Sequence, residues 1–558
     1  MINPLRYNVA DARLAFSGRH ELIPMSKDKL STFNLRHQEV LSFYGLELID
    51  GTIFMIDDRG NGRSNLGVFR SKQLRQTVIL AAALPAVAVA IDGFGALKNV
   101  PKDLQTPALI DQFKRRNDRT AAQVMSEVLQ ITTENFDVGE EVIVESIITE
   151  GVRVKPGIEI GGNPTIPVGA LFGKDEHCSR YGRGLNKEVS KLSMGSDVID
   201  GTGKTVKGGH SSLTALFITE SGFKRHLPDI YVERWMTGAM FPEFNPRETN
   251  LQEEVKIIAD ACGKKDFSEI TAYFLDRPRH HTTMDRLNAL GVATPFDKDG
   301  DLFPALVMGL AGLCFPDGRG LHSMIGEIGG SAEWVVGSLP LVWRGGQSLG
   351  MLTSQSSLTR KDLAPEELWN ERFHYTEEEL ILLQDARFEQ KPFFTVSDIM
   401  ENPFAGGVSA FCAISDNYFF PPLEGVKVDR EQGLITTNTL MINSLGNIEH
   451  WQLTFKCVEG FNVTAEKMRS PKAELRAFDK AKIEEKIKTM ASNDVKRFRL
   501  KQFFVNDYYP AIIHTAGKMI VLEKTVEALI ARGAFSELDR DIVKATTKAV
   551  PEWFTAAA

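Results

Sequence analysis

Residues 197–202 read Asp-Val-Ile-Asp-Gly-Thr and continue into Gly203-Lys204-Thr205. Two carboxylates and a hydroxyl fall within six residues, with the Ile199 carbonyl between them. Mg²⁺ and Mn²⁺ prefer oxygen ligands that converge from a tight turn, so this stretch is typical of a hard-cation site in metal-assisted phosphoester hydrolysis. The alternative is an ordinary Asp-Gly surface turn, because both residues favour turns. The motifs elsewhere in the sequence are therefore needed to choose between a metal site and a surface turn.

The Gly-Lys-Thr tripeptide also resembles the end of a nucleotide-binding P-loop. That motif requires a second glycine five residues before the first residue of the tripeptide, and Val198 stands there. A P-loop is therefore excluded.

Between about residues 140 and 457, β-branched or aromatic runs alternate with segments of helical periodicity. The expected strands are 142–148, 213–218, 270–275, 408–414, 434–442 and 450–457, and the expected helices are 251–262, 282–290, 302–313 and 332–343. Such alternation favours a layered α/β architecture. Two earlier helices are expected over 73–90 and 106–130, a hairpin-like stretch over 45–54, and charged helices beyond about 465.

Length and composition limit the function classes. A chain of 558 residues with 43% apolar and 25% charged residues indicates a soluble protein of two or three domains. A net charge of −8 lacks the basic excess that nucleic-acid binding needs. The five scattered cysteines suit a reducing compartment, so we expect a cytoplasmic protein. The apolar run over 78–91 is short and contains Pro85, which predicts a buried helix rather than a membrane span.

Further motifs follow the 197–202 loop in a fixed order. They are Leu-Pro-Asp-Ile-Tyr at 227–231, Ser-Glu-Ile-Thr at 268–271, Arg-Pro-Arg-His at 277–280, Asp-Gly-Asp at 299–301, Gly-Gly-Ser-Ala-Glu at 329–333, Leu-Glu-Gly-Val at 423–426 and Gly-Leu-Ile-Thr-Thr-Asn-Thr-Leu at 433–440. Together they resemble the class II (GlpX-type) fructose-1,6-bisphosphatases of the lithium-sensitive, metal-dependent sugar and inositol phosphatase superfamily. The resemblance covers about residues 140–457 and implies an α-β-α-β-α sandwich.

The resemblance also implies residue roles. Metal ligands would be Asp197, Asp200, Glu333 and the Ile199 carbonyl, binding Mg²⁺ or Mn²⁺, with Asp197, Asp200 and Thr202 as the catalytic group. The phosphorylated sugar would be held by Tyr231, Arg277, Arg279, Asp299, Gly300 and Asp301. Two of these assignments have plainer alternatives: Glu333 complements a helix dipole, and residues 299–301 form a solvated turn. His280 and His281 are expected to cap the following helix rather than to bind metal.

One departure from the family bears on activity. The family has an acidic Gly-Glu-Gly-Glu-Ile-Asp-Glu-Ala-Pro-type segment before the metal loop, and residues 158–167 here lack the acids expected at its key positions. Another expected Asp has no clear counterpart. The candidates to fill these gaps are Glu159, Asp92, Asp118 and Glu327. Two hypotheses stay open: a metal-dependent sugar phosphatase active in gluconeogenesis, or a catalytically degenerate homologue that binds a sugar phosphate or has a structural role.

The predicted organisation has four parts. Residues 1–71 form an N-terminal extension, 72–245 the metal-loop half of the core, 246–460 the sugar-phosphate half, and 461–558 a helical C-terminal extension. We expect a homo-oligomer that binds a phosphorylated sugar and neither nucleic acid nor membrane.

Overall fold

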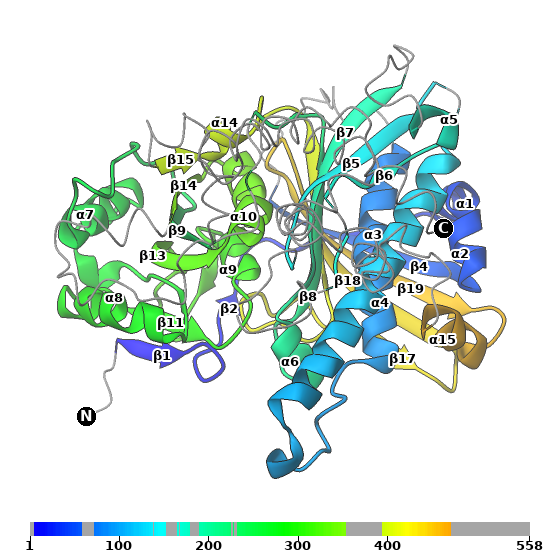
Figure 1. Ribbon diagram of the computed structural model, residues 1–558, viewed down its shortest axis with the longest axis horizontal. Coiled ribbons are helices and arrows are strands. Elements are labelled where there is room, and N and C mark those ends of the chain that lie inside the picture. The colour runs from blue at the N-terminus through cyan, green and yellow to red at the C-terminus, as the bar shows by residue number, and fades with distance from the viewer. Residues whose placement is uncertain are drawn as a thin grey trace, which may run out of the picture.

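The computed structural model describes residues 5–57, 72–137, 139–151, 164–166, 168–178, 189–224, 227, 231–352 and 393–469. Its elements stack as helices, a large sheet, helices, a smaller sheet and helices (Figure 1). The predicted α-β-α-β-α sandwich is confirmed. Three buried apolar clusters fill the spaces between these layers.

In the described residues the large sheet has ten strands, nine in the order β3-β4-β19-β18-β16-β8-β7-β5-β6 and β17 beside β18. Most pairs are antiparallel, but β5 and β7 run parallel. The strands are β3 (Glu21–Pro24), β4 (Leu46–Asp57), β5 (Val142–Thr149), β6 (Leu171–Phe172), β7 (Ser190–Asp200), β8 (Leu213–Thr219), β16 (Gly407–Ala413), β17 (Lys427–Asp429), β18 (Leu434–Asn443) and β19 (Ile448–Cys457).

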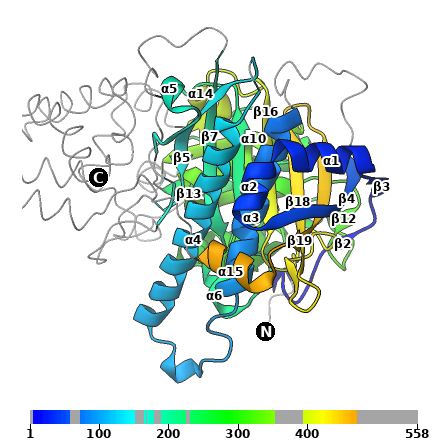
Figure 2. The same ribbon diagram turned by 90° about the vertical axis from the view of Figure 1, so that its right-hand side faces the viewer.

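One face of this sheet is covered by helices from both ends of the described chain (Figure 2). These are α1 (Lys27–Arg36), α2 (Gln38–Phe43), α3 (Lys72–Asp92), α4 (Pro107–Glu134) and α15 (Phe461–Arg469). Helix α3 is apolar on all sides and therefore buried, as helices of that composition are. It alone among the described helices is long and apolar enough to cross a membrane, and 83% of that stretch is buried in the protein.

The other face of the large sheet packs on α9 (Leu302–Val307) and α10 (Ser331–Trp343). Beyond them lies a four-stranded sheet, β13-β9-β14-β15, with α7 and α8 outside it. Its elements are β9 (Tyr231–Thr237), α7 (Leu251–Ala261), α8 (Pro278–Ala289), β13 (Ser323–Gly330), β14 (Gln347–Leu352) and β15 (Phe393–Thr395). A small sheet, β1-β11-β10, joins β1 (Arg6–Asn8), β10 (Phe274–Leu275) and β11 (Thr294–Asp297).

The remaining elements are short. They are β2 (Ala15–Phe16), which pairs with β12 (Leu313–Cys314), α5 (Asp175–Cys178), α6 (Thr202–Lys207), α14 (Val396–Ile399), and two 3₁₀ turns at Lys102–Leu104 and Phe267–Glu269.

Three sequence predictions need correction. The 45–54 stretch is not a hairpin but part of the single long strand β4, paired on both edges. The helix expected over 302–313 ends at Val307, because Gly309 adopts positive φ close against Gly238. Residues 5–57 are built into the sheets, where β1 pairs with β11 and β4 with β19. The charged helices expected beyond residue 469 lie outside the described residues.

The boundary drawn at residue 245 does not separate the two sheets. Strands β16 to β19 belong to the large sheet together with β5 to β8, although they come from the predicted sugar-phosphate half. Strand β9 comes from the predicted metal-loop half and lies in the smaller sheet. Each predicted half therefore contributes strands to both sheets. As a result, motifs from distant parts of the chain lie together between the two sheets.

Candidate active site

The Asp-x-x-Asp-Gly-Thr loop stands at the end of a central strand. Strand β7 runs to Asp200, Gly201 turns the chain with a φ of 80°, and α6 begins at Thr202. Asp197 and Asp200 are only 2% and 5% exposed. The Asp197 side chain accepts a hydrogen bond from the Ile199 amide at 3.1 Å, which closes the turn. An ordinary surface turn is thus the wrong interpretation of this stretch.

Two further acids reach this strand end from neighbouring elements. Asp118, buried in the middle of α4, accepts a hydrogen bond from the Thr202 hydroxyl at 3.0 Å. Glu150 directly follows β5, and its backbone amide donates to the Ser196 carbonyl of β7 at 3.0 Å. The parallel β5 and β7 place their carboxyl ends side by side, so acids that follow them lie together.

The electrostatics of Asp197 show how closely these acids gather. Burial raises the pKa of Asp197 well above its ordinary value, and the charges of Glu150, Asp200, Glu333 and Asp118 raise it further. Glu333 lies in the first turn of α10, which packs against β7. Five carboxylates from four separate segments, β7, α4, α10 and the end of β5, thus lie around one buried strand end.

Sequence reasoning found only part of this cluster. Asp118 is one of the candidates named from the sequence, whereas Asp92, another of them, pairs with Arg116 and Arg469. Glu327 is buried in another ion cluster, and Glu159 lies outside the described residues. Glu150 is not among the predicted residues, because the family resemblance places this acid in residues 158–167; the signal for it is its position directly after an apolar strand.

The predicted sugar-phosphate turn, residues 299–301, packs directly on the predicted metal loop, residues 197–202. A Cβ on Gly300 would lie 3.4 Å from Asp200 Oδ2, and the Leu302 amide donates to that same oxygen at 3.3 Å. The Gly203 amide donates to Asp299 Oδ2 at 3.0 Å. The motifs at 197–202 and 299–301 therefore form one site.

The backbone of Ser211 explains the glycine in both motifs. Among the described residues Ser211 alone has a positive φ (60°) without being glycine. Its carbonyl would lie 3.4 Å from a Cβ on Gly201 and equally from one on Gly300, both of which also have positive φ. The two turns meet over this carbonyl, and only glycine combines that conformation with so close an approach.

The two predicted phosphate arginines are placed differently. Arg277 caps α8, is partly exposed and lies 3.5 Å from Asp299 Oδ1. Arg279 is mostly buried and donates to the Ile328 carbonyl from Nε at 2.9 Å and from Nη2 at 2.7 Å. Its guanidinium also lies 5.3 Å from the Tyr231 ring centre. Arg277 is therefore the more accessible cation of the two.

Asp301 is engaged in a buried ion cluster that the sequence did not predict. Arg234 of β9 is wholly buried and pairs with both Asp301 and Glu327. A Cβ on Gly329 would collide with Arg234 Nη2 and Asp301, so the cluster is tightly enclosed. Burial raises the pKa of Asp301 although the charge of Arg234 opposes this. The carboxylate of Asp301 thus supports the turn from inside.

His280 and His281 do not lie with the acid cluster. His280 is buried between the Leu275 carbonyl, which contacts Nδ1 at 2.7 Å, and the Ile328 amide, which donates to Nε2 at 2.9 Å. Burial lowers its pKa well below the ordinary value, so it is neutral. His281 contacts Asp276 at 3.0 Å. Both lie inside α8, whose N-cap residue is Arg277, so the expectation that they cap the helix is wrong.

The donor set suits a hard divalent cation, because it consists of carboxylates and the Ile199 carbonyl. As the side chains stand, however, no three His, Cys, Asp or Glu residues in the described ranges are grouped closely enough to hold one ion. Glu333 folds back over Gly330, where its Oε2 occupies the space of a Cβ. The acids fit the ion in chemistry and location, and binding requires mutually repelling side chains to turn inward.

The site thus combines a layered α/β sandwich, buried acids at a strand end and a neighbouring arginine, Arg277. Residues 179–452 match the family described as bacterial fructose-1,6-bisphosphatase, glpX-encoded. The matched segment is 274 of the 558 residues, slightly less than half of the chain, and over it the sequence is similar to that family. Asp118 and Glu150 precede the matched segment.

Individual relatives agree with this assignment at modest identity. A D-fructose 1,6-bisphosphatase class 2/sedoheptulose 1,7-bisphosphatase from Synechococcus sp. (strain JA-2-3B'a(2-13)) is 28% identical over 171 residues, 30% of this chain and 46% of the relative. The protein of the same description from Prochlorococcus marinus (strain AS9601) is 24% identical over 332 residues, 58% of this chain and 90% of the relative. The chain thus spans about half the length of the Synechococcus relative.

Proposed function

We propose that this protein is a metal-dependent phosphatase that removes one phosphate from a sugar bisphosphate. The observation that carries the proposal is the convergence of Asp118, Glu150, Asp197, Asp200 and Glu333 on one buried strand end. The relatives' description as fructose 1,6- and sedoheptulose 1,7-bisphosphatases supports these two sugars as the first candidates. When bound, Mg²⁺ or Mn²⁺ would polarise the phosphate and acidify a water molecule.

The chain's own residues have distinct tasks in this proposal. Asp197, Asp200, Glu333 and the Ile199 carbonyl hold the ion. Glu150 takes the place of an acid that residues 158–167 lack, and Asp118 takes the place of the further expected Asp. Thr202, whose hydroxyl donates to Asp118 or to the Ile199 carbonyl at 3.0 Å, fixes the loop and is placed to orient water.

The remaining residues bind the substrate. Arg277 would bind the phosphate that is retained, with Arg279 and Tyr231 behind it, and Asp299 would accept hydrogen bonds from sugar hydroxyls. Gly300 lets the turn approach Asp200, and Asp301 supports the turn through Arg234.

The degenerate homologue remains the competing hypothesis, and its main support has weakened. It was based on missing acids, whereas Asp118 and Glu150 bring the number near the strand end to five. The cytoplasmic location, the homo-oligomeric state and the place in gluconeogenesis stay predictions.

Phosphate release from both bisphosphates, with Mg²⁺ or Mn²⁺, tests the proposal. We expect metal-dependent turnover that Asp200→Asn lowers by at least about 100-fold, since this change deletes a ligand charge at nearly constant volume. Asp92→Asn is the matched control, because Asp92 pairs with Arg116 and Arg469 outside the cluster. Binding of the bisphosphates without any release by the wild type would instead favour the degenerate homologue.

A further inference from the structure

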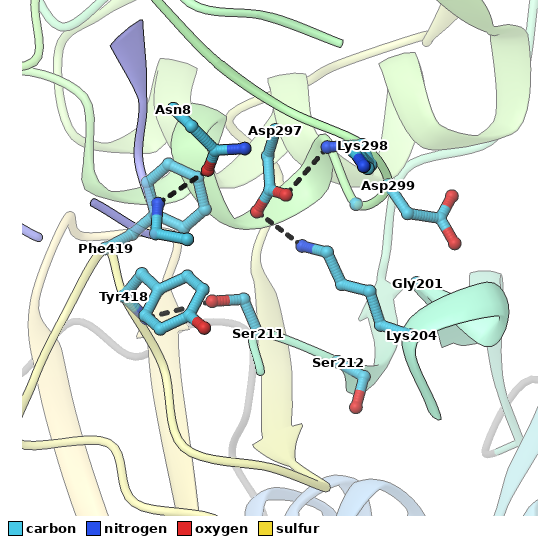
Figure 3. A network of polar contacts seen from close by, with 12 residues as sticks. Asn8, Gly201, Lys204, Ser211, Ser212, Asp297, Lys298, Asp299, Tyr418 and Phe419 are labelled. Carbon is cyan, nitrogen blue, oxygen red and sulfur yellow. Dashed lines mark hydrogen bonds and ion pairs between the residues drawn. The ribbon is translucent and has the colours of Figure 1, made fainter. Parts of the chain in front are cut away.

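Lys204 links the two motifs of the site. It lies in the first turn of α6, directly after the metal loop, and its Nζ contacts Asp297 Oδ2 at 2.6 Å (Figure 3). Asp297 is the last residue of β11, and its other oxygen accepts the Lys298 amide at 2.7 Å. The side chains of Lys204 and Asp297 are only 11% and 6% exposed. The ion pair is thus largely shielded from water, and it joins helix α6 to the end of strand β11.

A second contact runs parallel to this ion pair. The Gly203 amide donates to Asp299 Oδ2, while Asp299 Oδ1 faces Arg277 at 3.5 Å. The first turn of α6 therefore holds both acids of the 297–299 segment, and Arg277 is oriented through one of them. Moving this segment away from α6 would move the candidate phosphate cation with it.

Lys204 also carries a positive charge toward the acid cluster. A Cβ on Gly201, the residue that follows Asp200, would lie 3.6 Å from Lys204 Cδ, so the Lys204 side chain runs along the turn that carries Asp200. A cation built into the chain at this place opposes binding of a further cation and favours binding of an anion. Its two effects on ligands are therefore opposite in sign.

We propose that Lys204 is a positioning residue that holds the 297–301 turn on the metal loop, and that its charge favours the sugar phosphate at some expense of metal affinity. This inference rests on the proposed function. It adds the residue whose charge determines the relative affinities for the metal ion and for the sugar phosphate. Lys204 touches no reacting atom in this role; it acts through Asp297, Asp299 and Arg277.

The test uses the full chain with Lys204→Met, which keeps the aliphatic stem, and Lys204→Arg, which keeps the charge. Mn²⁺ affinity is measured by electron paramagnetic resonance, and fructose 1,6-bisphosphate affinity by calorimetry. For Lys204→Met we expect Mn²⁺ to bind about three- to tenfold more tightly and the bisphosphate about tenfold more weakly. KM rises while kcat changes little, and Lys204→Arg restores both affinities. Lys207→Met, an exposed change in the same helix, is the control.

If Lys204→Met simply loosened the site, the affinities for Mn²⁺ and for the bisphosphate would both fall. A fall in both affinities therefore overturns the proposal, and so does no change in either. Asp297→Asn separates the two effects: the bisphosphate should bind more weakly, while Mn²⁺ should not gain affinity, because Lys204 keeps its charge. Thermal melting confirms that each variant is folded. A wild type that binds neither ligand overturns the proposed function together with this inference, whereas an active wild type matched by Lys204→Met overturns the inference alone.

Discussion

Some of the groups around Asp197 could be predicted from the sequence, and others could not. The spacing from Asp197 to Thr202 predicted the metal loop, because the relevant groups are neighbours in sequence. Glu150 and Asp118 could not be assigned in this way, since they reach Asp197 through the β5–β7 pairing and through α4. The ion cluster of Arg234 could not be predicted from sequence spacing either: Glu327 reaches Arg234 through the pairing of β13 with β9, and Asp301 reaches it from the turn before α9.

Glu150 provides the prediction at this scale. Glu150→Gln removes one of the charges around Asp197 without changing the backbone contact to Ser196, so metal binding should weaken about 10- to 100-fold while the fold is kept. Mn²⁺ titration followed by electron paramagnetic resonance measures this, with Asp92→Asn as the control. Equal affinities for the wild type and Glu150→Gln would remove Glu150 from the site.

At the scale of elements, the long strands and helices were predictable and the turns between them were not. The 142–148, 408–414 and 434–442 runs appear as β5, β16 and β18 nearly as predicted, because β-branched and aromatic side chains suit buried strands. Strands β9 and β13 were not predicted, and α9 is shorter than its apolar pattern. Where a helix such as α9 ends depends on glycines with positive φ, and that conformation depends on which backbone segment packs against the glycine, as Gly238 packs against Gly309.

Gly300 and Gly318 form a matched pair for testing this. Both have positive φ, but a Cβ on Gly300 would approach Asp200 and the Ser211 carbonyl, whereas one on Gly318 would meet nothing within 4 Å. Alanine at either position should cost roughly 1–2 kcal/mol of unfolding free energy from φ alone. Only Gly300→Ala should also reduce bisphosphate binding, which calorimetry measures. If Gly318→Ala reduced binding equally, the contact argument would be wrong.

At the scale of the whole molecule, buried histidines couple stability to pH. Burial lowers the pKa of His37 to about 4, of His322 to about 4 and of His450 to about 3, and it lowers the pKa of His280 as well. The unfolded chain takes up these protons near pH 6.5, whereas the folded protein does not. Stability is therefore present above about pH 6.5 and is lost as pH falls below it, by up to about 1.4 kcal/mol per histidine and pH unit.

His450→Gln isolates one of these contributions, because glutamine does not titrate and can still bond Asn438, which His450 contacts at 2.9 Å. Urea unfolding of both proteins at pH 7.5 and 5.5 should show a loss of stability about 1 kcal/mol smaller in the variant. The buried acids act with the opposite sign, but they are common to both proteins and cancel in the comparison. Parallel pH profiles would mean that His450 takes up its proton as readily folded as unfolded.

The pairing of β4 with β19 has a consequence for biosynthesis. A ribosome completes β4 about 400 residues before its partner, which at roughly 5–20 residues per second is a delay of ~20–80 s. Among the described residues, the short β3 is the one partner strand of β4 that has been synthesised by then. A two-stranded ribbon is marginally stable in water. Its open edge is a template for pairing with other nascent chains. We therefore expect chaperone dependence during translation and a refolding yield that falls steeply with protein concentration.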